Sequence, residues 1–133
     1  MPIGSSPDPR NLITKLAGYK RVVDVANSVT IVDDLAAVVV RLLELRATGT
    51  FHGTNPGAMK HRELLALYKE LVDPEHEVEM ITEEELSASG LIQKSRSNCL
   101  LRSDRLKELG IEMRPIDVAL RATMVEYAKA MRG

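Results

Sequence analysis

The sequence has few aromatic residues and a single cysteine. Its 133 residues include one Phe, three Tyr and no Trp, so the hydrophobic core must be built from aliphatic side chains and Met. Because Cys99 is the only cysteine, no disulfide can form within the chain. A chain without disulfides fits a reducing compartment, and we therefore expect a cytoplasmic protein.

The sequence also lacks an excess of basic charge and a long apolar run. It has 18 Lys and Arg against 19 Asp and Glu, whereas a dedicated nucleic-acid binder needs a basic excess to displace counterions. The most apolar stretch, residues 35–45, contains Arg41 and Glu44 and is too short to span a bilayer. Residues 1–10 contain no apolar signal core. We expect neither nucleic acid nor a membrane among the partners.

The patterning predicts one α/β domain over residues 1–133, with about six helices and about four short strands. Asp8 and Pro9 are typical of a helix start, and Thr82 with Glu85 forms a capping box. The expected helices lie at residues 9–17, 35–46, 61–72, 83–89, 103–109 and 115–131, and the expected strands at 21–25, 28–32, 50–53 and 77–81. Residues 26–27 resemble a turn.

The helix at residues 35–46 is apolar on most faces, which predicts that it is well buried. The four short strands carry no hairpin signal and make a thin sheet for so many helices. This imbalance indicates that a further sheet belongs with the domain.

The signatures of a complete nicotinamide enzyme are absent. The only glycine series, Gly49, Gly53 and Gly57, lacks the GxxGxxG spacing and does not lead directly into a helix. A short-chain dehydrogenase also needs a Tyr with a Lys four residues later, but the residues four positions after the three tyrosines are Val23, Val72 and Met131. Whether the chain is an enzyme by itself is therefore uncertain.

Other catalytic patterns are equally unsupported. The histidines His52, His61 and His76 have no metal-ligand spacing, and no GxSxG motif is present. We expect no metal site. Tyr68 and Tyr127 are expected to pack through their rings with hydroxyls in water, and Cys99 is expected to be a small buried hydrophobe.

Two polar stretches could bind an anion. One is residues 9–11 (PRN) and the other is residues 94–98 (KSRSN). The planar fork of an Arg suits a diphosphate because it can bond two oxygens at once. A solvated loop is the alternative, and spacing alone leaves both open.

The order of short segments along nearly the whole chain is similar to a known family. The segments are residues 1–3 (MPI), 11–15 (NLITK), 27–35 (NSVTIVDDL), 49–51 (GTF), 54–57 (TNPG), 63–65 (ELL), 73–74 (DP) and 96–98 (RSN), with Tyr68 and the helix around Leu106 and Lys107. They resemble the C-terminal part of the extended short-chain dehydrogenases that make activated rhamnose. These are the nucleotide-rhamnose synthases (UDP-4-keto-6-deoxyglucose 3,5-epimerase/4-reductases) and, more distantly, the dTDP-4-dehydrorhamnose reductases.

The resemblance implies the C-terminal portion of an NAD(P)-binding Rossmann-type enzyme whose N-terminal Rossmann half is missing here. Residues 21–46 would pack against that half, supplied in cis or in trans. The cofactor NAD(P)H would be held mainly outside this chain, and the ligand would be a UDP- or dTDP-4-keto-6-deoxyhexose. The family's catalytic residues precede the point at which this sequence begins, so none is assigned.

The resemblance implies substrate contacts for several residues of this chain. Met1, Pro2 and Ile3 match a loop beside the nicotinamide and the sugar, and Asn11 and Lys15 match a helix that faces the nucleotide sugar. Asn55, Arg96 and Asn98 match positions near the pocket, and Arg96 is the candidate for phosphate. The chain departs from the family pattern at Gly4, Ser95, Cys99 and Arg102, which leaves its substrate choice open.

The expected function is the nucleotide-sugar-binding portion of an NAD(P)H-dependent epimerase/reductase of deoxysugar biosynthesis, not catalytically complete alone. Two alternatives stay open: a free-standing non-enzymatic module that binds a ligand or a protein, and a truncated inactive fragment. If the chain is such a portion of a larger enzyme, the apolar surface that the Rossmann half would cover should cause the isolated chain to self-associate.

Overall fold

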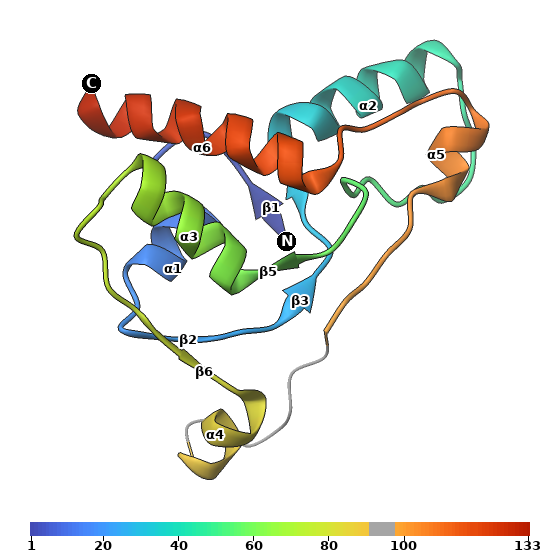
Figure 1. Cartoon of the computed structure of the whole chain (residues 1–133). Helices are drawn as coiled ribbons and strands as arrows, with labels where there is room; N and C mark the ends of the chain where they lie inside the picture. Colours follow the sequence, from blue (N-terminus) through green and yellow to red (C-terminus); the bar gives the residue numbers. More distant parts are fainter. Residues whose placement is uncertain (91–97) are drawn as a thin grey trace.

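The computed structural model describes residues 1–90 and 98–133. A main body contains helices α1 (Leu12–Ala17), α3 (His61–Leu71) and α6 (Ile116–Arg132), packed around short strands (Figure 1). Helices α2 (Val32–Glu44) and α5 (Asp104–Glu108) form an arm at one side, and α4 (Glu83–Ala88) lies at the opposite end. The α/β class and the six helices of the prediction are confirmed within these residues.

The strands form three separate pairs. Parallel pairs join β1 (Pro2–Ile3) to β4 (Thr30–Ile31) and β2 (Arg21–Val23) to β6 (Glu79–Ile81). The third pair is antiparallel and joins β3 (Ala26–Asn27) to β5 (Met59–Lys60). The described residues thus contain six very short strands where about four were predicted. Parallel strands normally lie in larger sheets covered on both faces, so the two-stranded β1–β4 pair is unusually small for a parallel arrangement.

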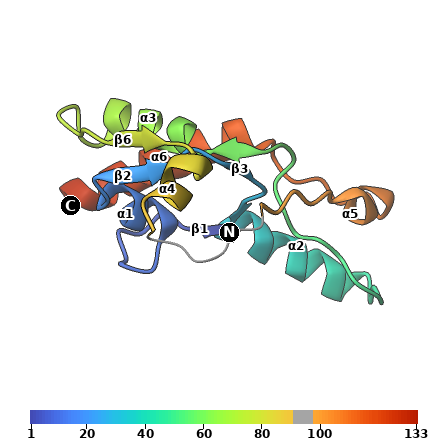
Figure 2. The ribbon, with the colours of Figure 1, turned by 90° about the horizontal axis from the view of Figure 1, so that it is seen from below.

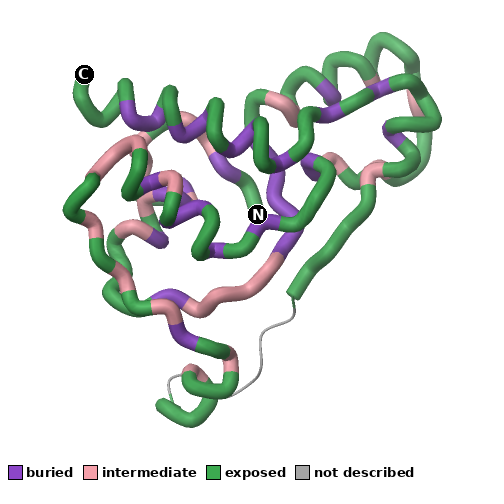
Figure 3. Tube along the Cα trace, viewed as in Figure 1, coloured by how far each residue is buried: buried purple, intermediate pink, exposed green. Residues whose placement is uncertain are grey.

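The main core lies where α1, α3 and α6 face one another (Figure 3). Its fully buried members include Ile3, Ile13, Leu64 and Met124, so the predicted aliphatic core is confirmed. Tyr127 closes one side of this core with its ring and donates or accepts a 2.8 Å hydrogen bond with the Thr14 hydroxyl. The expectation of a wet hydroxyl is therefore wrong for Tyr127, because Thr14 takes the place of water.

The arm has a small core of its own. Val38 of α2 packs with Leu106, Ile111 and Met113, and Leu42 and Phe51 lie against them. The view in Figure 2 shows α2 and α5 extending away from the main body. Only Val38 of α2 is buried. The prediction that this helix is well buried is wrong, because most of its apolar surface has nothing in the described chain to cover it.

Several predicted boundaries need correction. Helix α1 starts at Leu12, because the Asn11 side chain caps it by accepting from the Ile13 N–H at 3.2 Å. Asp8 instead accepts from the Arg10 backbone at 2.8 Å and from its guanidinium. Helix α2 begins at Val32, three residues before the predicted start at residue 35, so Asp33 and Asp34 lie in its first turn.

Two strand predictions also fail. Residues 50–53 are not a strand, because Gly53 O accepts a hydrogen bond from the Thr30 hydroxyl (2.7 Å) instead of joining a ladder. Residues 26–27 were expected to turn but form β3, which pairs with β5. The capping box of α4, the helix at α3 and the start of α6 after Pro115 are confirmed.

Gly57 is the glycine whose replacement should be most informative. It has φ +98°, and a Cβ there would lie 3.0 Å from Ile116 Cγ2. We expect Gly57→Ala to lower the free energy of unfolding by about 2 kcal/mol, because left-handed strain and crowding add. Gly110→Ala is the matched control, since Gly110 has φ +75° with nothing within 4 Å of its Cβ position. Equal losses in urea unfolding would show that Ile116 contributes nothing.

Candidate nucleotide-sugar surface

The predicted site residues fall on four parts of the structure. Met1 precedes β1, which contains Pro2 and Ile3, and Asn11 and Lys15 belong to the start and the exposed side of α1. Asn55 precedes β5, and Asn98 is exposed on the way to α5. Arg96 lies outside the described residues, so its predicted phosphate contact is not placed here.

The structure brings Met1 and the stretch after Asn98 together at Asn27 and Ser28. The Met1 ammonium donates to Ser28 O at 3.3 Å, and Thr30 N–H donates to Met1 O at 2.9 Å. Ser28 also contacts the other stretch, because its N–H donates to Cys99 O at 2.8 Å. The two regions that the resemblance assigns to substrate are thus neighbours through one short stretch of backbone.

Side chains complete this contact. Asn27 Oδ1 accepts from Cys99 N–H at 2.8 Å, and the Ser28 hydroxyl accepts from Leu101 N–H at 2.6 Å. Asn27 and Ser28 are both buried. Cys99 is exposed, which corrects the expectation of a buried thiol, because only its backbone faces the body of the molecule. Asn27 and Ser28 were not predicted as site residues, and only their place in the quoted segment hinted at them.

Asn98 lines a hollow of about 380 Å³ at the carboxyl ends of β2 and β6. Open α/β sheets typically bind their ligands outside the carboxyl ends of their strands. The other lining residues come from the ends of these strands, from β3 and from the first turns of α3 and α4: Asp24, Val25, Ala26, Arg62, Met80, Ile81, Thr82, Glu83 and Glu84.

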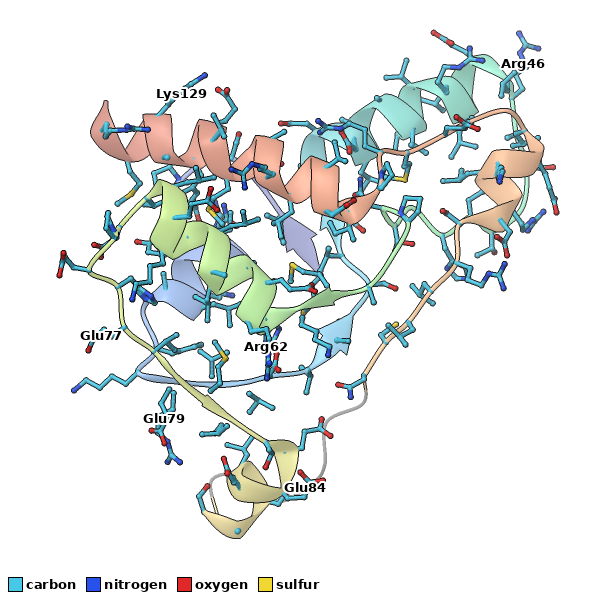
Figure 4. All side chains as sticks on the ribbon, viewed as in Figure 1. Arg46, Arg62, Glu77, Glu79, Glu84 and Lys129 are labelled. Carbon is cyan, nitrogen blue, oxygen red and sulfur yellow. The ribbon has the colours of Figure 1, made fainter. Side chains whose placement is uncertain are left out.

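The charges described in this hollow favour hydroxyl groups over phosphate. Arg62 is its one described cation and is already paired with Asp24, which also accepts from the Arg62 backbone at 3.4 Å. Figure 4 shows Arg62 below α3 and Glu84 on α4. Carboxylates accept hydrogen bonds from sugar hydroxyls but repel phosphate oxygens. A cation for a diphosphate would therefore have to come from outside these lining residues.

The polar atoms of the Asn11 side chain are all used within the chain. Its Nδ2 donates to Gly4 O at 2.6 Å and to Ser6 O at 2.8 Å, while Oδ1 caps α1. Asn11 therefore fixes the loop that follows β1. Lys15 is exposed one turn further along α1, where its ammonium can reach solvent or a ligand.

Asn55 is likewise committed to internal hydrogen bonds and is only 1% exposed. Its Oδ1 accepts from Ile31 N–H at 2.8 Å, and its Nδ2 donates to Asp34 Oδ2 at 2.8 Å and to Arg114 O at 3.0 Å. Asp34 in turn accepts from the Arg114 guanidinium, and that bond raises the pKa of Arg114. Asn55 thus joins the strand β4 to the arm and does not line the hollow.

The described residues do not fit the pyrophosphate of a dinucleotide cofactor. The Cβ positions of Gly49, Gly53 and Gly57 face Arg105, Leu35 and Ile116 of this chain, so none opens a cradle for phosphate. The start of α3 is already capped, because Lys60 N–H donates to Glu63 Oε2 at 2.9 Å. Tyr68 is buried, which raises the pKa of its hydroxyl, opposite to the change that a catalytic tyrosine needs.

Within residues 1–90 and 98–133, no three His, Cys, Asp or Glu side chains lie where they could hold a metal ion together. None of the helices in this part of the chain combines the length and the apolar character needed to cross a membrane. The hollow beside Asn98, with the Asn27 and Ser28 contacts, remains the best-supported candidate site.

Comparisons with known proteins show which proteins the chain is similar to. No family model matches the chain. It is 40% identical over 108 residues to the bifunctional dTDP-4-dehydrorhamnose 3,5-epimerase/dTDP-4-dehydrorhamnose reductase of Arabidopsis thaliana, a match that covers 80% of this chain and 35% of the relative. It is 32% identical over 129 residues to a trifunctional UDP-glucose 4,6-dehydratase/UDP-4-keto-6-deoxy-D-glucose 3,5-epimerase/UDP-4-keto-L-rhamnose-reductase of the same plant, covering 96% of this chain and 18% of the relative.

A solved structure gives the same result in three dimensions. The UDP-rhamnose synthase of Acanthamoeba polyphaga mimivirus superposes with a TM-score of 0.84 at 33% identity, over 95% of this chain and 43% of that one. The class defined by these matches is the nucleotide-sugar epimerase/reductases. Within that class, the chain is homologous to the C-terminal region of the rhamnose synthases and dTDP-4-dehydrorhamnose reductases. The chain spans between 18% and 43% of the length of these relatives.

Proposed function

We propose that this chain is the nucleotide-sugar-binding portion of an NAD(P)H-dependent epimerase/reductase of rhamnose biosynthesis and does not complete the reaction alone. One observation carries the proposal: Asn98, expected from the family to lie near substrate, lines a hollow at the carboxyl ends of β2 and β6. The Met1 end of β1, which has the same expected role, joins this region through Ser28. The ligand would be a UDP- or dTDP-4-keto-6-deoxyhexose.

The cofactor would be held by a separate Rossmann half, in cis or in trans. A dTDP-4-dehydrorhamnose reductase of Bacillus anthracis, with the same fold at 17% identity, was solved in complex with NADP. The glycines of the present chain are occupied by its own side chains, so the pyrophosphate of NAD(P)H would bind to the other half. In such an assembly, Pro2 and Ile3 would lie beside the nicotinamide and the sugar, and the protein would act in the cytoplasm.

The arm supplies a surface for that half. Exposed apolar residues recur on one side of α2 with helical spacing, at Val32, Ala36, Val39, Val40 and Leu43. The opposite side carries Val38 and faces the arm's own core. Strand β4 of the β1–β4 pair leads directly into α2. Strands of the other half could therefore add to this parallel pair beside β1, and α2 would cover one face of the extended sheet.

Titration of the chain with UDP-rhamnose, UDP and dTDP tests the ligand. We expect heat in calorimetry and NMR shifts around Asn98, and we expect Arg96→Ala to weaken binding about tenfold or more because an Arg–phosphate pair is charge-assisted. Arg46→Ala is the matched control, since this exposed arginine lies at the tip of the arm (Figure 4).

Three results would count against the proposal or against a part of it. Binding of none of the three nucleotides would exclude a ligand site that works in the isolated chain, unless addition of a Rossmann half from a relative restored it. An equal effect of Arg96→Ala and Arg46→Ala would remove the phosphate assignment. Binding without any gain of reductase activity on adding that half would favour the free-standing, non-enzymatic module.

A further inference from the structure

Residues 98–101 are held in place by hydrogen bonds to Asn27 and Ser28 and not by regular secondary structure. They belong to no helix or strand, and Asn98, Cys99 and Leu100 are all exposed. Such a segment has little apolar contact of its own to fix its position. Its position therefore depends on the hydrogen bonds that it makes with the body of the molecule.

Two consecutive residues supply these bonds. Both backbone polar groups of Cys99 are engaged: its N–H donates to Asn27 Oδ1 at 2.8 Å, and its carbonyl accepts from Ser28 N–H at 2.8 Å. Both backbone groups of Leu101 meet the Ser28 hydroxyl, which accepts at 2.6 Å and donates at 3.3 Å. These hydrogen bonds hold the backbone of Cys99, the residue immediately after Asn98.

Asn27 and Ser28 are themselves buried and bonded to other parts of the chain. Asn27 lies in β3 opposite Met59 of β5, and Ser28 O accepts from the Met1 ammonium at 3.3 Å. Asn27 is 8% exposed and Ser28 is 5% exposed. The buried side chains of Asn27, in β3, and Ser28, directly after it, can hold the exposed segment in one position. Their hydrogen bonds form only when the segment is in that position, whereas water could bond to the segment in any position.

We propose that Asn27 and Ser28 are positioning residues that hold Asn98 against the ligand hollow and so set the affinity for the nucleotide sugar. This inference rests on the proposed function, since it assigns these residues a role in that same site. Neither side chain lines the hollow, so both act through the segment that follows Asn98.

The single cysteine makes the position of the segment directly measurable. Cys99 is exposed and is the only cysteine of the chain, so a nitroxide or trifluoromethyl label attaches at one place. In Asn27→Ala and Ser28→Ala we expect the label to become more mobile and the affinity for UDP-rhamnose to fall about tenfold. Asn27→Asp keeps the acceptor for Cys99 N–H and should restore both values.

Thr30→Ala is the matched control. Thr30 is similarly buried and its hydroxyl donates one hydrogen bond to a backbone carbonyl, but that carbonyl belongs to Gly53 and not to residues 98–101. A purely structural role for Asn27 predicts that Thr30→Ala lowers affinity as much as Asn27→Ala at equal loss of thermal stability. That outcome, or an unchanged label mobility in both Asn27→Ala and Ser28→Ala, would overturn the inference.

The experiment separates the two proposals. If the wild-type chain binds no nucleotide with or without a Rossmann half, the proposed function fails, and the inference about affinity falls with it whatever the label shows. If the wild type binds and Asn27→Ala frees the label without weakening binding, the proposed function stands and the positioning role is wrong. If Asn27→Ala does not fold, Ser28→Ala and Asn27→Asp provide the same comparison.

Discussion

Replacing Asn55 with alanine is expected to lower the free energy of unfolding by about 3 kcal/mol. The amide is almost fully buried and makes three side-chain hydrogen bonds, so its loss leaves the Ile31 N–H without an acceptor. It also removes a donor to Asp34 and one to the Arg114 carbonyl. Urea unfolding followed by circular dichroism measures the effect.

Two variants make this result specific. Asn55→Asp keeps the acceptor for Ile31 but places a carboxylate against Asp34, so we expect a similarly large loss through repulsion. Asn98→Ala removes the same amide from an exposed position and should change stability by less than about 0.5 kcal/mol. If Asn55→Ala were as mild as Asn98→Ala, the junction between β4 and the arm would contribute nothing to stability.

The largest effect on assembly is expected from Val40→Asp in α2. If a Rossmann half covers this face, the variant buries an unpaired charge in place of an apolar side chain and should weaken association by about 100-fold. The isolated chain should stay folded, since Val40 is 54% exposed, and should self-associate less. Mixing with the N-terminal half of a rhamnose synthase and measuring binding by calorimetry tests this expectation.

Val118 provides a matched control for that substitution. It is also a helical valine, in α6, and its exposure of 55% is nearly the same. Val118→Asp should leave association unchanged, because it lies on the main body and not on the arm. Equal losses for the two variants, or none for Val40→Asp, would contradict docking on α2.

Local signals in the sequence predicted the parts of the fold that local interactions determine. Thr82 and Glu85 form the expected capping box, since each side chain bonds the other's backbone. The helix predicted at residues 103–109 is followed by Gly110, whose left-handed backbone, with φ +75°, is typical of a glycine after a helix. Helix α3 also agrees within a residue at its end, because its apolar stripe faces the core.

Features that depend on distant parts of the chain were not predictable in the same way. The apolar residues of α2 were correctly predicted to be helical, but helical spacing does not show whether another part of the chain covers them, and most of them are exposed. The strand β3 exists only because β5 lies beside it, although its sequence resembles a turn. Cys99 is exposed because Asn27 and Ser28 hold its backbone, a contact between residues more than seventy positions apart.

The family resemblance named residues for the candidate site, and their roles stay predictions. It implied that Asn98 lies near the substrate, and in the structure Asn98 lines the hollow proposed as the site. The resemblance also implied substrate contacts for Asn11 and Asn55, but their side chains are committed to internal hydrogen bonds. It gave no means of distinguishing such residues from residues whose side chains are free to contact a ligand. Spacing along the chain cannot show this difference, because it arises from which carbonyls and N–H groups the fold brings within reach.

The separation of the buried residues into a main core and a small arm core has a consequence for how the molecule unfolds. The four buried residues of the arm core are too few to hold it together independently, so opening of the arm is expected at a lower free energy than global unfolding. A protein that covers α2 would raise the free energy of opening of the arm toward that of global unfolding. The arm and the main body would then unfold as one cooperative unit. Amide hydrogen exchange in the arm would then report occupancy by that protein, while exchange in α3 and α6 would report the stability of the rest.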